Sequence, residues 1–90
     1  MNYTLTQAWE AYAAKDYTLA KRIFLALQAI APSAETRRHH EMGYAYVLLA
    51  EGQRGEAEAL LKRLYAETQD AKFLVPLDEL NERDERQEKP

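Results

Sequence analysis

Apolar residues recur at helical spacing in four successive segments of this 90-residue chain. In the first segment they lie three or four positions apart, at Leu5, Ala8, Trp9 and Tyr12. Such a stripe is typical of one buried face of an α-helix. Pro32 and Gly52 mark two of the breaks between segments, because each residue favours a helix end. The pattern predicts an all-α fold with helices over about residues 3–14, 18–30, 34–50 and 55–68.

The first pair of segments matches the second pair when the chain is shifted by 37 positions, from Ala8 to Ala45. Further along, the same shift superimposes the small residue Ala20 on Ala57. It also superimposes the large residue Phe24 on Leu61. Small alanines allow two antiparallel helices to approach closely, and the large residues then fill the space towards the next hairpin. Since each hairpin buries only part of its apolar surface, the repeat predicts hairpins that stack on one another.

With this repeat the chain resembles a tetratricopeptide repeat protein. In the first copy the shared pattern consists of Asp16-Tyr17 at the turn, Ala20-x-x-x-Phe24 in the second helix and Pro32 at its end. The second copy has Gly52 at the turn and Ala57-x-x-x-Leu61 after it. The resemblance covers about residues 3–68. It implies an α–α superhelix of two hairpins, at about residues 3–31 and 34–68, within one domain over residues 1–77.

The chain departs from the family pattern in several ways. The copies lie 37 positions apart rather than ~34. The second copy lacks the closing Pro, and Ala8 occupies a position where Gly is commonest. Two copies are also fewer than the three or more that such arrays usually need. The resemblance therefore implies that the C-terminal segment, a second chain or a partner covers an open end.

The helical pattern weakens after Asp70. A fifth apolar patch over residues 73–80 is interrupted by Pro76. The first turn of a helix tolerates proline, so a C-terminal helix over about residues 76–83 is predicted. From Asn81 onwards no residue is apolar, and residues 78–90 are expected to form a charged helix end or a disordered tail. The sequence leaves open whether the fifth patch caps the stack or occupies a groove.

Charge and composition exclude several classes of protein. Residues 1–77 carry equal numbers of acidic and basic side chains, so the whole net charge of −3 falls in residues 78–90. A neutral body with an acidic tail is a poor match for nucleic acid or for an anionic membrane surface. The chain has no cysteine, no apolar run near the ~18 residues of a membrane span, and no signal-peptide pattern at its start. We therefore expect a cytoplasmic protein without disulfides or thiolate metal sites.

His39, His40 and Glu41 invite comparison with a metal site, but adjacent side chains on a helix point roughly 100° apart and cannot share one ion. A helical zinc pair places its histidines four positions apart, and the chain has only two histidines. Carboxylate pairs such as Glu56 and Glu58 or Asp78 and Glu79 lie on polar faces, whereas a catalytic acid needs a desolvating pocket. Neither a glycine-rich phosphate loop nor a nucleophile elbow occurs. We expect no metal, no cofactor and no enzymatic activity.

The tetratricopeptide resemblance implies that the first helix of each hairpin lines a groove. The groove positions are Asn2, Leu5, Trp9, Tyr12 and Ala13 in the first copy and His39, Met42, Tyr46, Leu49 and Ala50 in the second. The candidate partner-binding residues among them are Leu5, Trp9, Tyr12, His39, Met42, Tyr46 and Leu49. Aromatic residues and Met are favoured at interfaces, so this groove suits an amphipathic helix. Alternatively, these are ordinary core residues that pack on the chain's own residues 73–80.

These features together favour a protein–protein interaction module that binds a hydrophobic helical segment of a partner, as a small chaperone or adaptor. In size, acidic character and lack of cysteine the chain is similar to the small tetratricopeptide chaperones of bacterial type III secretion. Those proteins bind aggregation-prone needle or translocator subunits in the cytoplasm. The alternative is a self-associating structural domain without a client, in which the exposed hairpin ends of two copies pair.

Overall fold

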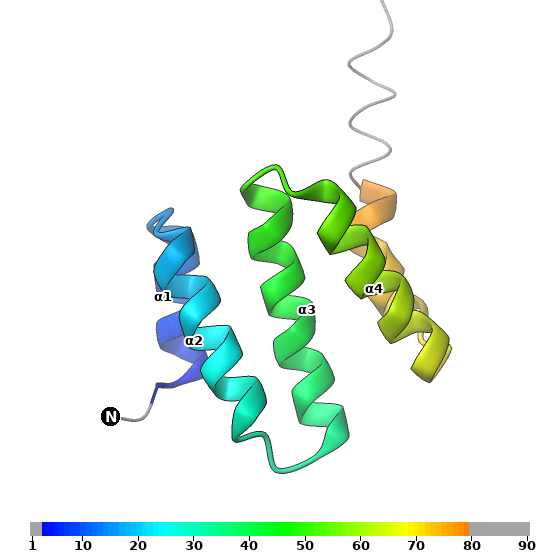
Figure 1. Ribbon diagram of the computed structural model, residues 1–90, viewed down its shortest axis with the longest axis horizontal. Helices are drawn as coiled ribbons and strands as arrows, with labels where there is room; N and C mark the ends of the chain where they lie inside the picture. The colour runs from blue at the N-terminus through cyan, green and yellow to red at the C-terminus, as the bar shows by residue number, and fades with distance from the viewer. Residues whose placement is uncertain (1–2, 80–90) are drawn as a thin grey trace, which may run out of the picture.

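The computed structural model describes residues 3–79, and helices account for most of that span (Figure 1). The four α-helices and one 3-10 helix are α1 (Leu5–Ala13), α2 (Tyr17–Ala29), α3 (Ala34–Ala50), α4 (Arg54–Thr68) and η1 (Ala71–Leu74). Residues 75–79 are also helical. No strand occurs between residues 3 and 79, and the predicted all-α class is confirmed. Residues 80–90 lie outside the described residues, and with them most of the predicted tail over residues 78–90 and the remainder of the predicted C-terminal helix.

Each helix packs mainly on the helix that follows it in the chain. Helix α1 packs on α2, α2 on α3, α3 on α4, and α4 on η1. Figure 1 shows the α1–α2 pair at one end of the molecule, α3 in the middle, and α4 with η1 at the other end. Every main contact is therefore local in sequence, as expected for hairpins built from short connections.

Side-chain caps fix the starts of the first three helices. Thr4 forms a capping box with Gln7: its hydroxyl accepts a hydrogen bond from the Gln7 amide at 3.2 Å, and the Gln7 side chain accepts one from the Thr4 amide at 2.8 Å. Ser33 accepts from the Thr36 amide at 3.1 Å at the start of α3. Asp16, which the sequence pattern places in a turn, accepts from the Leu19 amide and caps α2.

Left-handed residues follow the ends of the helices. Gly52 has φ +85° just beyond α3, as its sequence position predicts. Lys15 and Gln69 have φ values of 63° and 58° after α1 and α4. Neither was expected there, because residues with a Cβ visit this region uncommonly.

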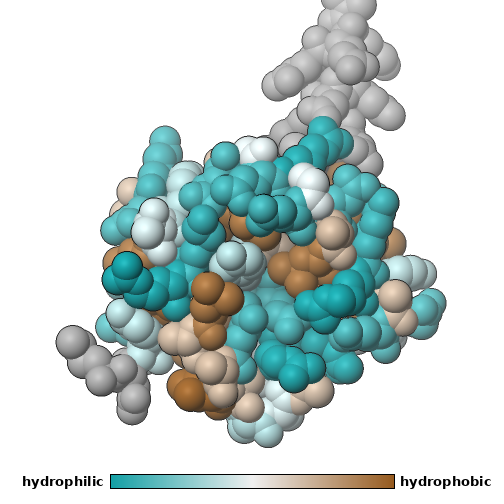
Figure 2. All heavy atoms as spheres, viewed as in Figure 1, coloured by the Kyte–Doolittle hydropathy of each residue, from teal (hydrophilic) through white to brown (hydrophobic). Residues whose placement is uncertain are grey.

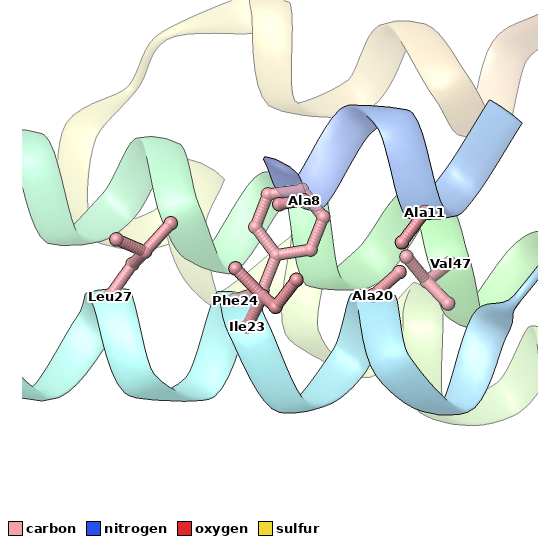
Figure 3. Close-up of a cluster of buried hydrophobic side chains, with 7 residues drawn as sticks. All are labelled: Ala8, Ala11, Ala20, Ile23, Phe24, Leu27 and Val47. Atoms are coloured by element: carbon pink, nitrogen blue, oxygen red, sulfur yellow. The ribbon is translucent and has the colours of Figure 1, made fainter. Parts of the chain in front are cut away.

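Two clusters of buried side chains form the core. The first joins α1, α2 and one residue of α3 (Figure 3), and it consists of Ala8, Ala11, Ala20, Ile23, Phe24, Leu27 and Val47. The second joins α3, α4 and the C-terminal segment through Ala45, Leu61, Leu64, Phe73 and Leu77. Three of the pairs that the 37-position shift superimposes are fully buried, namely Ala8 and Ala45, Ala20 and Ala57, and Phe24 and Leu61. Such burial is what a close approach of the helices requires.

Gly43 allows α3 to approach α2 closely, and the sequence pattern gave no reason to single it out for this role. It lies inside α3 and faces the ring of Phe24. A Cβ atom added at this position would lie 2.3 Å from the Phe24 Cε1 atom, far inside van der Waals contact. Glycine inside a helix is otherwise unfavourable by roughly 0.5–1 kcal/mol relative to alanine. The contact with Phe24 explains why it is present.

An ion-pair network ties α3 to α4 around a buried carboxylate. Glu41 is only 8% exposed, and its carboxylate accepts a hydrogen bond from Arg63 at 2.8 Å. Arg37 approaches the same carboxylate at 3.5 Å. On the other side, Arg63 donates to Glu67 at 3.0 Å. A buried carboxylate without such cations would cost several kcal/mol, so the network balances the burial of Glu41.

Candidate protein-binding face

Three of the predicted groove residues on α1 share one side of that helix. Leu5, Trp9 and Tyr12 are spaced four and three positions apart, which places them on a single stripe. Leu5 is 43% exposed and Trp9 is 38% exposed, although both side chains are large and apolar. Tyr46 of α3 reaches the same place, because its ring contacts the ring of Trp9. We call the surface formed by Leu5, Trp9, Tyr12 and Tyr46 the aromatic face.

Trp9 lies at the centre of the aromatic face and touches three other rings edge to face. The centroids of Trp9 and Phe24 are 5.1 Å apart with the planes at 76°. The centroids of Trp9 and Tyr12 are 5.6 Å apart with the planes at 87°. Those of Trp9 and Tyr46 are 6.1 Å apart with the planes at 68°. Such edge-to-face pairs contribute about 0.5–1.5 kcal/mol each beyond the area they bury. Trp9 is therefore held in one position by the core while more than a third of it remains open to solvent.

Tyr46 combines an apolar ring with a polar edge. Burial raises the pKa of its hydroxyl above the ordinary value of 10.0, and the Glu79 carboxylate and the Tyr12 hydroxyl raise it further. The hydroxyl is therefore neutral at neutral pH and can donate a hydrogen bond. The helical segment over residues 75–79 lies beside α3, because Leu77 packs with Ala45 in the second core cluster.

Met42 and Leu49 are placed differently from the residues of the aromatic face. Both are half-buried and pack against the second core cluster, which includes Phe73 and Leu77. The alternative interpretation was that the groove residues are core residues that pack on the C-terminal segment. It describes Met42 and Leu49 well. It does not describe Trp9, whose ring contacts are with α1, α2 and α3.

His39 does not join the aromatic face. It lies two helical turns before Tyr46 on α3, or about 10 Å along the axis, and lines a separate hollow of about 230 Å³. The walls of that hollow are mostly charged or polar, and the Lys72 Nζ atom lies 3.4 Å from the His39 Nε2 atom. Asp70 borders the same hollow. The backbone amide of Lys72 lowers the pKa of the Asp70 carboxyl group, and the Lys72 side chain lowers it as well.

Within residues 3–79, no group of three or more histidine and carboxylate side chains is placed to hold a metal ion. None of the helices described in that span is long and apolar enough to cross a lipid bilayer. Comparison with protein-family models, curated proteins and solved structures gives no match for this chain. The chemistry of the aromatic face is therefore the basis for assigning a function.

Two contributions to this site escaped the sequence analysis. Phe24 was expected to fill the space between helices, and its ring also contacts the ring of Trp9. Glu79 raises the pKa of the Tyr46 hydroxyl. Helical spacing within α2 identified Phe24 as buried, but no local pattern links Glu79 to a residue so far back in the chain.

Proposed function

We propose that this protein is an interaction module that binds an amphipathic helix of a partner protein across the aromatic face. The observation that carries the proposal is the position of Trp9. Three aromatic neighbours hold its ring in place, and 38% of the residue is still exposed. Binding energy at interfaces is concentrated in such rigid aromatic residues, because they bury a large area without losing much conformational freedom.

The dimensions of the face favour a helix as the occupant. From Leu5 to Tyr12 the stripe runs seven residues along α1, which is about 10 Å. Two turns of a partner helix have the same length and present anchors at positions i, i+3 or i+4, and i+7. The Tyr46 hydroxyl adds one polar group to the face, and because it is neutral at neutral pH it can donate a hydrogen bond to an acceptor on the partner.

A small chaperone or adaptor is the role that suits this chemistry. A helix that is apolar on one side aggregates when free, and the aromatic face would cover it. The proposed identity is a tetratricopeptide-like protein similar to the type III secretion chaperones, acting in the cytoplasm without catalysis or a cofactor. Its support is the all-α fold, the local packing of successive helices and the full burial of the repeated alanines.

The proposal can be tested with the protein's own fluorescence, because Trp9 is its one tryptophan. The probe is a tryptophan-free synthetic helix with leucine at i, i+4 and i+7 and lysine at the flanking positions. We expect its binding to shift Trp9 emission to shorter wavelength, since the helix would displace water from the ring. A peptide of the same composition in scrambled order should leave the emission unchanged.

Two matched variants locate the binding. Leu5→Glu changes a residue of the aromatic face that is 43% exposed, and Leu25→Glu changes one that is 51% exposed on α2, outside that face. We expect Leu5→Glu to weaken binding at least tenfold and Leu25→Glu to leave it unchanged. Equal affinity in the two variants, or no emission shift at saturating peptide, would rule out the aromatic face as a helix-binding surface.

A further inference from the structure

The outer side of the α1–α2 hairpin carries a hollow of about 330 Å³. Tyr3 and Ala11 line it from the α1 side, and Leu19 and Ile23 line it from α2. Figure 1 shows that α3 and α4 lie on only one side of this hairpin. Much of the face of the molecule seen in Figure 2 is hydrophilic, and hydrophobic atoms reach it only in patches. A hollow with apolar walls is therefore a specific feature of this surface, and apolar surface with a polar rim often marks an interaction site.

The charged residues that line the hollow are both acidic. They are Glu10, in the last turn of α1, and Asp16, which caps α2. Both lie at the turn end of the hairpin, where the Asp16 amide donates to the Ala11 carbonyl at 2.9 Å. Neither carboxylate forms an ion pair with a lysine, arginine or histidine of the described span, residues 3–79. The turn end of the hollow therefore carries negative charge that no direct contact in that span neutralises.

The other end of the hollow is uncharged. On α2, Leu19 lies three positions after Asp16 and Ile23 lies seven positions after it, which is about 10 Å along the helix. The two helices are antiparallel, so Tyr3 and Gln7 at the start of α1 line the same end as Ile23. The hollow thus has an acidic end at the turn and an apolar end about two helical turns away.

We propose that this hollow binds a segment of a partner protein in which a lysine or arginine precedes or follows a large apolar side chain by one helical turn. The cation would lie beside the carboxylates of Glu10 and Asp16, and the apolar side chain would pack on Leu19 and Ile23. One oxygen of Asp16 accepts the Leu19 amide at 3.3 Å, and the other can accept from the cation. Two carboxylates beside an apolar surface attract a basic partner and repel an acidic one. A second copy of this chain, docked through the same hollow about a two-fold axis, would bring two further carboxylates to it.

The hollow is separate from the aromatic face. On α1, the residues of the hollow include Gln7 and Glu10, whereas the aromatic face uses Leu5, Trp9 and Tyr12. The two sets lie roughly half a helical turn apart, which places them on opposite sides of α1. A segment bound in the hollow would leave Trp9 exposed, so this inference does not rest on the proposed helix-binding function.

Fluorescence anisotropy of a dye-labelled peptide tests the inference. The probe is an alanine-based helix with arginine at position i and leucine at i+4, and it lacks the i+7 leucine of the peptide designed for the aromatic face. We expect the probe to bind without shifting Trp9 emission, and to bind more weakly as salt is added, because salt screens exposed charges. Glutamine in place of the arginine should weaken binding roughly two- to thirtyfold, the range that two exposed ion pairs supply. Equal affinity of the two peptides would overturn the proposal, as would a shift of Trp9 emission.

Two charge-matched double variants locate the binding. Glu10→Gln with Asp16→Asn removes both carboxylates of the hollow, and asparagine still caps α2. Glu35→Gln with Glu56→Gln removes two exposed carboxylates on α3 and α4, outside the hollow. We expect the first variant to lose affinity by the same factor as the glutamine peptide and the second to bind like the unaltered protein. Equal affinity of the two variants would contradict the proposal.

The mass in solution separates a partner segment from a second copy. Ala14 is exposed and lines the hollow, so Ala14→Arg places a long cationic side chain beside the two carboxylates. We expect this variant to lose the peptide and to keep the mass of the unaltered protein in light scattering. A mass of twice 10.4 kDa that Ala14→Arg reduces to that of one chain would assign the hollow to a second copy and overturn the proposal.

Discussion

At the scale of single residues, the positions that decide this structure are those where a small side chain meets a large one. Gly43 meets the ring of Phe24, and Ala8 is fully buried in the same cluster. Figure 3 shows the Phe24 ring between α1 and α2, directed towards Ala8. Because the Phe24 ring also contacts Trp9, a shift of the Phe24 ring would change the position of Trp9 on the aromatic face. Packing in the core and the shape of the proposed binding surface are therefore coupled through one side chain.

Gly43→Ala tests the contact between α3 and the Phe24 ring. The added methyl group would overlap that ring, which is fully buried. Overpacking of this kind costs about 1–3 kcal/mol, and the better helix propensity of alanine recovers up to about 1 kcal/mol. We expect a net loss of about 1–2 kcal/mol in urea unfolding. Gly55→Ala in α4 is the matched control, because its Cβ would meet no atom within 4 Å, and it should be neutral or slightly stabilising.

At the scale of helices, the ends and the contacts between neighbours depend on ionised side chains. Arg63 of α4 donates to Glu67 on the same helix and to Glu41 on α3. The Asp70 carboxylate accepts the Lys72 amide at 3.0 Å and caps η1. The hydrogen bond from Arg63 lowers the pKa of Glu67, and the Lys72 amide lowers the pKa of Asp70. These two carboxylates link the stability of the folded chain to pH.

The direction of that dependence follows from proton binding. A carboxyl with a lowered pKa in the folded state binds fewer protons there than in the unfolded state. Its contribution is complete above the unfolded pKa, near 4.5 for Glu67 and 3.8 for Asp70, and is lost as the pH falls through the folded value. We expect the melting temperature to drop from about pH 4.5 downwards. Glu67→Gln should make that drop smaller, and an equally steep drop in the variant would show that other groups control it.

The helices themselves could be predicted closely from the sequence. The predicted segment over residues 34–50 matches α3, and the other three differ from α1, α2 and α4 by one or two residues at an end. This agreement has a local cause, since the spacing of apolar residues and caps such as Ser33 act within one or two turns. The left-handed turn residues Lys15 and Gln69 could not be predicted, because the packing of adjacent helices imposes their conformation.

The candidate site could be predicted only in part. Spacing along α1 put Leu5, Trp9 and Tyr12 on one side, and the structure keeps them together. The separation of Met42 and His39 from these residues depends on Phe73 and Lys72, which lie far along the chain. No pattern within α3 contains that information, because the four predicted α3 residues, His39, Met42, Tyr46 and Leu49, are equally well spaced for one groove.

At the scale of the whole molecule, the C-terminal segment is part of the core. Phe73 is 2% exposed and Leu77 is 9% exposed, and both belong to the second cluster with Leu61 and Leu64. The segment thus covers the α4 end of the stack. The sequence had left open whether this apolar patch caps the stack or occupies a groove. The described part of the chain has no matching cover at the α1–α2 end.

Phe73→Ala should therefore destabilise the whole domain. Removing a buried phenylalanine costs about 3–5 kcal/mol, a large part of the roughly 5–15 kcal/mol that stabilises an ordinary small domain. We expect a strongly lowered urea midpoint in one cooperative transition. Val75→Ala, which changes a side chain that is 43% exposed in the same segment, should cost under about 1 kcal/mol. Similar losses for the two variants would show that the segment packs only loosely.

Val47 of α3 completes the first cluster, which otherwise comes entirely from the first hairpin. This has a consequence for the protein during its synthesis. When a ribosome has released only the first hairpin, this cluster still lacks Val47, and the nascent chain exposes apolar surface. Domains fold as units, so we expect folding to wait until α3 has left the exit tunnel. From that point each new helix finds its partner already in place, because successive helices pack on one another.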